Sequence, residues 1–266
     1  MIAINKIYHD DCLNILKQMP DNYIDLVLTS PPYDNLRTYN DTLVWSFEIF
    51  QEIAKELARV LKKGGCIVWV VADATIDGSE TGTSFRQALF FKELGLNIHD
   101  TMLFKKKNYT PLTHNRYEQE FEYMFCFSKG RPKTFNAIKV NCKYGGQLTR
   151  GSSSYYKKND GVLVKGGAKI IKETKIKGNI FEYIVGSLAT GKYQHPAMFP
   201  IELANDQIVS WSNENDLVLD PFGGSGTTAI ACSELKRNFI CIEKDKQYYE
   251  MSVKRLEDYN KQLKLF

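Results

Sequence analysis

The stretch Ile24-Asp25-Leu26-Val27-Leu28-Thr29-Ser30-Pro31-Pro32-Tyr33 joins an apolar run to a rigid polar turn. Its first five residues predict a buried strand. Each proline lacks a backbone N–H and fixes its own φ, and the second proline also restricts the residue before it. The carbonyls of Ser30 and Pro31 are therefore held as acceptors that no helix uses. Together with the Ser30 hydroxyl and the Tyr33 ring, they suit a flat substrate that carries an exocyclic amino group.

A second strand-to-helix junction, near the carboxyl end of the chain, is rich in glycine. Residues 216–220 predict a short strand and residues 227–235 a helix. The glycines between them let the backbone turn sharply and approach a ligand, and the helix start offers free N–H groups. The Gly-x-Gly-x-x-Ala spacing over 224–229 also fits a dinucleotide fingerprint. Glu243 ends the next predicted strand, where a ribose-binding carboxylate is expected.

Predicted helices and strands alternate along most of the chain. Phe47 to Leu61 shows helical spacing, and Gly64-Gly65 is the predicted stop signal of this helix. The apolar run Cys66 to Ala72 is typical of a parallel strand covered on both faces. A polar loop is expected from Asp73 to Thr83. Further helices are predicted over 85–94, from about 195 to 211 and over 246–263, and further strands over 98–104, 121–127 and 239–242.

This alternation predicts an α/β fold with a doubly wound, mostly parallel sheet. Ser30, Asp220 and Glu243 each stand at the carboxyl end of a predicted strand. In open α/β sheets the ligand crevice lies outside those ends, so the three residues are expected to meet at one site.

The composition is that of a soluble globular protein, with 266 residues, 43% hydrophobic and 25% charged. No apolar run approaches the roughly 20 residues that a membrane helix needs, and the start lacks a signal-peptide pattern. The six cysteines include no Cys-x-x-Cys pair, and Cys66, Cys126 and Cys241 are expected to be buried thiols. A cytoplasmic protein without a metal site is the expectation.

Positive charge is concentrated in one segment. Residues 129–178 contain 13 Lys and Arg residues against Asp160 and Glu173, a net +11, whereas the whole chain carries only +4. Such a concentration is typical of a nucleic-acid contact surface, although a solvated lysine-rich loop has the same composition. Interleaved tyrosines favour the polyanion surface. The candidate contacts are Arg37, Lys143, Arg150, Tyr155, Lys157 and Lys158.

Four motifs together resemble one enzyme family. Ser-Pro-Pro-Tyr at a strand end resembles the catalytic motif of the amino-methyltransferases of DNA, and Asp220 to Thr228 resembles their S-adenosylmethionine loop. The Asp-Pro at the start of that loop is not part of the dinucleotide fingerprint of nicotinamide-dependent enzymes. Asp10-Asp11-Cys12-Leu13 resembles the family's Gly-Asp-Cys-Leu stretch, with Asp10 in place of the glycine. The segment from His195 to Leu203 resembles its His/Lys-Pro segment.

The order of these motifs, with Ser-Pro-Pro-Tyr first and the basic segment between, resembles the beta class of the family. The resemblance implies a Rossmann-like methyltransferase fold made of residues 1–128 and 179–266. The inserted segment 129–178 would be the DNA target-recognition region. The implied catalytic residues are Ser30, Pro31, Pro32 and Tyr33. The implied cofactor-binding residues are Asp11, Thr29, His195, Pro196, Phe199, Asp220, Pro221, Phe222, Gly223, Gly224, Ser225, Gly226, Thr227 and Glu243.

The implied function is site-specific methylation of double-stranded DNA, on the exocyclic amine of a flipped base, with S-adenosyl-L-methionine as the cofactor. Serine at the first motif position is more typical of cytosine-N4 enzymes, which are favoured over adenine-N6 enzymes. Enzymes of this class are often dimers, so a homodimer and a cognate restriction endonuclease are further expectations. The sequence itself shows no subunit interface and no recognised DNA sequence.

Two other classes stay open from the residues alone. A nicotinamide-dependent oxidoreductase would use the same glycine loop but gives no role to Ser-Pro-Pro-Tyr. A non-catalytic nucleic-acid-binding module would use only the basic segment and would not need the glycine loop.

Overall fold

The computed structural model describes residues 2–33, 45–109, 115–148, 155–157, 159–165, 169–185 and 200–263. The chain divides into two compact units. The larger unit comprises Met1–Asn136 and Asn179–Phe266, and the smaller unit comprises Ala137–Gly178. The inserted segment was expected to begin at residue 129, but residues 129–136 belong to the larger unit.

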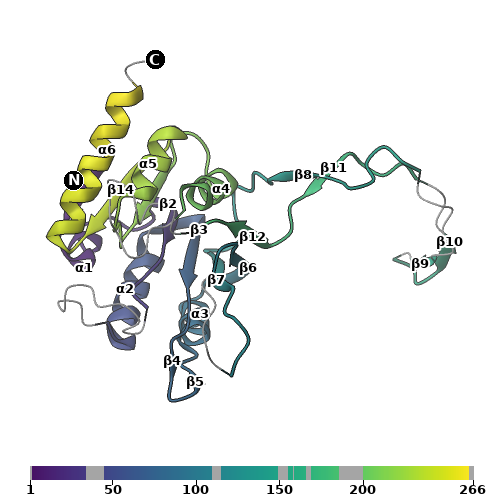
Figure 1. Ribbon diagram of the computed structural model, residues 1–266, viewed down its shortest axis with the longest axis horizontal. Coiled ribbons are helices and arrows are strands. Elements are labelled where there is room, and N and C mark those ends of the chain that lie inside the picture. The colour runs from purple at the N-terminus through teal and green to yellow at the C-terminus, as the bar shows by residue number, and fades with distance from the viewer. Residues whose placement is uncertain are drawn as a thin grey trace. The chain divides into compact units, whose positions relative to one another are not determined.

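An eight-stranded sheet forms the centre of the larger unit (Figure 1). Every neighbouring pair of strands in this sheet is parallel except the two pairs that β7 makes with β3 and β6. The prediction of a mostly parallel sheet is therefore confirmed. In spatial order the strands are β1 (Lys6–His9), β14 (Asn238–Glu243), β13 (Leu217–Asp220), β2 (Ile24–Thr29), β3 (Leu61–Val71), β7 (Phe121–Ser128), β6 (Asn97–Lys106) and β12 (Ile180–Tyr183).

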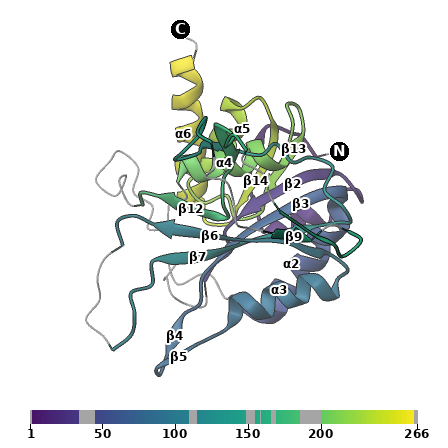
Figure 2. The same cartoon turned by 90° about the vertical axis from the view of Figure 1, so that its right-hand side faces the viewer.

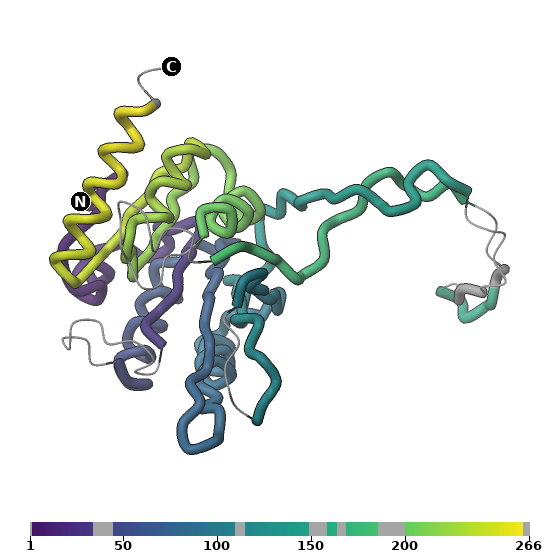
Figure 3. The backbone as a smooth tube through the Cα atoms, in the orientation of Figure 1, coloured from purple at the N-terminus to yellow at the C-terminus, as the bar shows by residue number. Residues whose placement is uncertain are grey.

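Helices cover both faces of the sheet, as a doubly wound fold requires. Figure 2 shows α2 (Phe47–Val60) and α3 (Thr83–Glu93) on one side, and α4 (Ile201–Trp211), α5 (Thr227–Glu234) and α6 (Lys246–Leu263) on the other. The short helix α1 (Cys12–Leu16) packs against α2. The first strand lies beside the last one, and Figure 3 shows the purple start of the chain next to the yellow helix α6.

Aromatic packing fixes α2 against the sheet. Ser46 caps the start of this helix by accepting a hydrogen bond from the backbone N–H of Ile49. Phe50, on the buried face, is fully buried and contacts Trp69 of β3 and Phe91 of α3 in edge-to-face geometry. Such pairs add about 0.5–1.5 kcal/mol each to the free energy of burial. The helical spacing read from the sequence therefore marks the core face of α2.

The predicted stop signal of α2 is wrong. The helix ends at Val60, and Leu61 is already extended, with φ −67° and ψ 129°. Gly64-Gly65 lies inside β3 instead. The end of the helix is satisfied by a distant cation, because Lys129 Nζ donates to the carbonyl oxygens of Ala58 at 2.8 Å and Leu61 at 2.9 Å. The sequence around α2 does not predict this contact, because Lys129 lies about 70 residues away in the chain.

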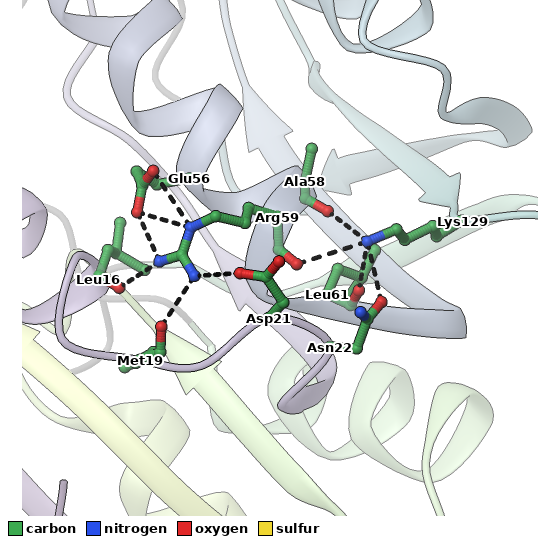
Figure 4. A network of polar contacts seen from close by, with 9 residues as sticks. All are labelled: Leu16, Met19, Asp21, Asn22, Glu56, Ala58, Arg59, Leu61 and Lys129. Atoms are coloured by element: carbon green, nitrogen blue, oxygen red, sulfur yellow. Dashed lines mark hydrogen bonds and ion pairs between the residues drawn. The ribbon is translucent and has the colours of Figure 1, made fainter. Parts of the chain in front are cut away.

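Arg59 completes the same polar network (Figure 4). Its guanidinium donates to the carbonyl oxygens of Leu16 and Met19, both at 2.8 Å. It also forms ion pairs of 2.7 Å with Asp21 and with Glu56. These contacts fasten the α1–β2 connection to α2. Lys129 belongs to this structural network, although the sequence placed it in the basic segment.

Two further segments differ in detail from the sequence reading. β3 is parallel to β2 but antiparallel to β7, so the expected parallel strand has a parallel neighbour on one side only. The expected loop over 73–83 contains a small hairpin of β4 (Thr75–Ile76) and β5 (Ser79–Glu80).

The described residues of the smaller unit form two antiparallel strand pairs. They are β8 (Lys139–Asn141) with β11 (Thr174–Ile176), and β9 (Tyr155–Lys157) with β10 (Leu163–Lys165).

Burial of the three thiols is confirmed. The exposed fractions of Cys66, Cys126 and Cys241 are 1% or less. Across the described residues, no helix combines the length and the apolar character needed to cross a membrane.

Replacement of Lys129 tests its structural role. Burial lowers the pKa of this lysine, and its ammonium group satisfies carbonyl oxygens at the end of α2. Lys129→Met should lower the free energy of unfolding by about 2 kcal/mol, because those carbonyls lose a charged partner. The exposed Lys63 supplies the control, and Lys63→Met should change stability by less than about 0.5 kcal/mol in urea unfolding. Equal effects of the two variants would contradict the capping role.

Candidate active site

A cavity of about 230 Å³ opens at the carboxyl edge of β1, β14, β13 and β2. Most of the residues singled out in the sequence line it. They are Asp11, Thr29, Ser30, Pro32, Tyr33, the run Asp220 to Ser225, Thr227 and Glu243. Because these strands are parallel, the turns that follow them meet at one edge of the sheet. The expectation that Ser30, Asp220 and Glu243 meet at one site is therefore confirmed.

Other candidate residues lie elsewhere. Pro31 is buried and does not line the cavity, and neither does Gly226, which is the N-cap of α5. Lys143, Tyr155 and Lys157 belong to the smaller unit, where Lys143 is exposed and its Nζ lies 5.4 Å from the Tyr144 ring centre. The side chains of Tyr155 and Lys157 lie outside the description, as do residues Arg37, Arg150, Lys158, His195, Pro196 and Phe199.

Asp220 lines the cavity and connects three neighbouring segments by hydrogen bonds. Its Oδ1 accepts hydrogen bonds from Thr29 Oγ1 at 2.7 Å and from the Phe222 backbone N–H at 3.1 Å. Its Oδ2 accepts one from Thr228 Oγ1 at 2.6 Å. Burial raises the pKa of this carboxyl, whereas the three donors act in the opposite direction. The carboxylate thus ties the end of β2 to the end of β13 and to the first turn of α5.

The glycine turn is held by the neighbouring strand. The Gly223 N–H donates to the carbonyl oxygen of Ile242 at 2.8 Å, and the Gly224 N–H donates to Glu243 Oε2 at 2.7 Å. Gly226 has φ +78°, and a Cβ there would lie 2.9 Å from the Cβ of Ser252 on α6. Only glycine meets both requirements, so the end of this turn can pack closely against α6.

Glu243 is oriented by backbone donors at the end of β14. Its Oε1 accepts from the Asp245 N–H at 2.8 Å, and its Oε2 from the Gly224 N–H. Burial raises the pKa of the Glu243 carboxyl. Each oxygen keeps acceptor capacity beyond these bonds, so the side chain can accept hydrogen bonds from a diol in the cavity.

Asp11 has two structural partners in addition to its place on the cavity wall. Its Oδ1 caps α1 by accepting from the Leu13 N–H at 3.0 Å, and its Oδ2 forms an ion pair of 2.9 Å with Lys244. Lys244 also lines the cavity, yet sequence reasoning missed it. Its position directly after Glu243 was the only available signal.

Apolar side chains that the sequence did not assign complete the wall. Trp45, Ile49, Ile53 and Tyr248 line the cavity, and Trp45 contacts Phe222 edge to face, with 5.5 Å between ring centres. Ile53 could have been found from the helical spacing of α2. No pattern marked Trp45 or Tyr248, because their placement depends on tertiary packing.

The Ser-Pro-Pro-Tyr turn forms another part of the cavity wall. Ser30 Oγ lies 2.8 Å from Tyr33 Oη, and Tyr33 Oη donates to Glu122 Oε2 at 2.7 Å. Tyr33 lines the cavity although it is only 8% exposed, and its hydroxyl contacts Ser30 and the buried Glu122. Glu122 is a partner that sequence reasoning missed.

Comparison with known proteins identifies the family. The model of the DNA methylase family matches residues 24–254. This chain belongs to that family. The orphan methyltransferase M.BamHII of Bacillus amyloliquefaciens is 48% identical over 246 residues, which cover 90% of this chain and 91% of that protein. The type II methyltransferase M.BglII of Bacillus subtilis is 28% identical over 258 residues, covering 94% of this chain and 68% of the relative.

Solved structures agree with the fold. The M1.HpyAVI–SAM complex has a TM-score of 0.63 and 27% identity, with 94% of this chain and 98% of that chain covered. The cytosine-N4-specific PvuII DNA methyltransferase has a TM-score of 0.70 at 22% identity, covering 98% of this chain and 93% of that chain, a likeness of fold.

The chain is thus a beta-class DNA amino-methyltransferase, and S-adenosylmethionine is its cofactor. The cavity fits this cofactor. A carboxylate held by backbone donors suits a ribose diol, a glycine turn gives close backbone approach, and apolar side chains suit an adenine ring. The oxidoreductase and the non-catalytic binding module are ruled out as descriptions of this chain.

Replacement of Asp220 tests whether its hydrogen bonds to Thr29, Phe222 and Thr228 stabilise the fold. Asp220→Ala leaves two buried hydroxyls and one part-buried backbone N–H without their acceptor and should lower the free energy of unfolding by about 3 kcal/mol. Asp220→Asn should cost about 1 kcal/mol, because the amide oxygen can serve Thr29 and Phe222 while the amide nitrogen donates to the Thr228 hydroxyl. Chemical denaturation of both variants measures the difference, and equal losses would contradict this stabilising role.

The difference in stability between the wild type and Asp220→Asn should depend on pH, in a direction set by the Asp220 pKa. Because burial raises the Asp220 pKa above its ordinary 3.8, the folded protein takes up this proton at higher pH than the unfolded chain. The stability of the wild type relative to Asp220→Asn should therefore rise as the pH falls from 7 toward about 4. A relative loss of wild-type stability over that range would contradict the sign of this shift.

Proposed function

We propose that this enzyme transfers a methyl group from the sulfonium of S-adenosylmethionine to the exocyclic amine of a base flipped out of double-stranded DNA, at specific sites and with cytosine N4 as the favoured target. The N–CH₃ bond would form as the S–CH₃ bond breaks, leaving S-adenosylhomocysteine, and the amine would lose one proton to water. One observation supports the reaction geometry above all others. Ser30 lines the same cavity as Gly223, Gly224 and Glu243, so the catalytic turn and the cofactor turn face one space. The direct bond between Thr29 and Asp220 supports the same arrangement.

The cofactor would be held at the end of the cavity formed by β14 and β13. Glu243 would bind the ribose hydroxyls, the backbone from Gly223 to Ser225 would approach the methionine portion, and Asp11 would lie near the adenine. When bound, S-adenosylmethionine supplies an electrophilic methyl group on a sulfonium. Asp220 would act mainly by shaping the turn, because its oxygens already accept from three donors.

The protein's own task is to orient a poor nucleophile. The lone pair of a nucleobase amine is delocalised into the ring, and an acceptor for its N–H localises and aims that lone pair. The Ser30 hydroxyl would be this acceptor, and the Tyr33 ring at the cavity wall would stack on the base. Orientation of this kind contributes up to roughly 7–11 kcal/mol. Leaving the duplex costs a few kcal/mol, which stacking and phosphate contacts offset.

The DNA would be contacted by the smaller unit. Residues 137–178 contain ten Lys and Arg residues and only two acidic ones. Its short antiparallel strand pairs carry several of these cations, including Lys139, Lys157, Lys165 and Lys175. Phosphate contacts of this kind position a protein on DNA, and base contacts specify the site.

The choice of base rests on Ser30, which favours cytosine N4. Adenine N6 is the alternative, and one relative supports it. The DNA adenine methyltransferase YhdJ of Escherichia coli (strain K12) is 28% identical over 260 residues.

The partners of the enzyme are also a proposal. M.BamHII is named an orphan methyltransferase, which supports an enzyme without a cognate endonuclease, whereas the type II relatives support pairing with a restriction endonuclease. A homodimer remains part of the proposal.

The product decides between these bases. The purified enzyme should transfer radiolabelled methyl groups from S-adenosylmethionine to DNA of diverse sequence. Mass spectrometry of the nucleosides should then find N4-methylcytosine. N6-methyladenine alone would overturn the proposed base but not the reaction class. No labelled DNA from folded, cofactor-bound enzyme would overturn the proposed function.

A serine variant tests the role of the catalytic turn in the same assay. Ser30→Ala should lower kcat by about 100-fold while changing the cofactor Kd by less than about twofold, because the lost acceptor acts on the amine. Ser79→Ala, at an exposed position on β5, is the control and should keep full activity. Full turnover by Ser30→Ala would refute the assigned role.

A further inference from the structure

Glu122 is a buried carboxylate behind the catalytic turn. It lies near the amino end of β7, and β7 is antiparallel to β3 and β6. The amino end of an antiparallel strand lies at the same sheet edge as the carboxyl ends of its neighbours. Glu122 therefore reaches the edge where Ser30 follows β2, although it does not line the cavity.

Among the described residues, each oxygen of Glu122 has one partner. Its Oε1 lies 2.6 Å from Nζ of Lys106, which stands at the end of β6, and its Oε2 accepts from Tyr33 Oη at 2.7 Å. The Glu122 side chain is 8% exposed. A carboxylate in this position is a strong acceptor, because an ionised oxygen at 2.7 Å outcompetes the Val70 carbonyl oxygen, which lies 3.4 Å from Tyr33 Oη.

The direction of the next hydrogen bond follows from this contact. A phenol has a single proton, and Tyr33 gives it to Glu122. In the 2.8 Å contact between the two hydroxyls, Ser30 must therefore be the donor and Tyr33 Oη the acceptor. Once Ser30 has directed its only proton toward Tyr33, its lone pairs are left for the cavity. Ser30 can then accept a hydrogen bond from a substrate but cannot donate one.

We propose that Glu122 is a positioning residue that acts through Tyr33 to fix Ser30 as a hydrogen-bond acceptor. The inference rests on the proposed function of the catalytic turn, in which Ser30 accepts from the N–H of the target amine. It adds a source of specificity. A base that presents an amino group matches the fixed acceptor, and a base with a carbonyl oxygen at that position meets a lone pair instead.

The Lys106 contact makes the inference testable, because it predicts that one substitution reverses the direction of the hydrogen bond between Ser30 and Tyr33. Glu122→Gln leaves only one acceptor oxygen, and Lys106 is an obligate donor that would take it. The amide N–H₂ would then face Tyr33. The Tyr33 proton would go to Ser30 Oγ, at 2.8 Å, in preference to the Val70 carbonyl oxygen, at 3.4 Å, and the Ser30 proton would be turned toward the cavity. We expect kcat to fall by about 100-fold, with the cofactor Kd changed by less than about twofold.

A second substitution should restore the original direction. In the double variant Glu122→Gln, Lys106→Met the amide oxygen is free to turn toward Tyr33, so kcat should recover by about tenfold or more. Lys106→Met alone should keep kcat within about fivefold of wild type, because Glu122 still accepts from Tyr33. A residue needed only for packing would show no such recovery when a second contact is removed.

The matched control is Glu120→Gln, which lies two residues before Glu122 and forms an ion pair with Lys105. It should leave kcat unchanged within about twofold, and thermal melting should show that all variants are folded. Full kcat in Glu122→Gln, or a double variant no better than the single one, would overturn the inference.

Ser30→Ala, assayed in parallel, distinguishes failure of the proposed Glu122 role from failure of the proposed function. Loss of turnover in Ser30→Ala with full turnover in Glu122→Gln would reject only the role of Glu122. Full turnover in Ser30→Ala, or an inactive wild type, would reject the proposed function and this inference together.

Discussion

The buried hydrogen bond from Thr29 to Asp220 joins the two halves of the active site. Thr29 is the last residue before the Ser-Pro-Pro-Tyr turn, and Asp220 is the first residue of the glycine turn, 191 positions later in the chain. The same carboxylate fixes Thr228 in the first turn of α5. Because both strands are parallel neighbours in the sheet, one side chain sets the distance between the cofactor turn and the catalytic turn. The cavity depends on this constraint.

The sequence predicted much of this arrangement because the information is local. Apolar runs fixed the strands, and each of the residues Ser30, Asp220 and Glu243 ends such a run. A parallel sheet then brings those ends to one edge without further knowledge of packing. The cofactor turn was visible for the same reason, since glycine at positions such as Gly226 is required by the local backbone.

The rest depends on contacts between distant segments. Glu122 reaches the site only because β7 runs antiparallel, and an apolar strand pattern does not reveal its direction. Lys129 looked like one cation among many in a basic segment, yet it satisfies the end of α2. The error at Gly64-Gly65 also involves a distant segment, because α2 ends at Val60, where Lys129 satisfies carbonyl oxygens at its end. Trp45 lines the cavity because of tertiary packing, and Lys244 lines it next to Asp11, with which it forms an ion pair.

A crystal structure of the enzyme with S-adenosylmethionine bound tests the central claim most directly. The account predicts that the cofactor lies against Glu243 and the turn from Gly223 to Ser225, with its methyl-bearing end directed toward Ser30. A cofactor bound in another cavity, or one whose methyl group is directed away from the Ser-Pro-Pro-Tyr turn, would contradict the account.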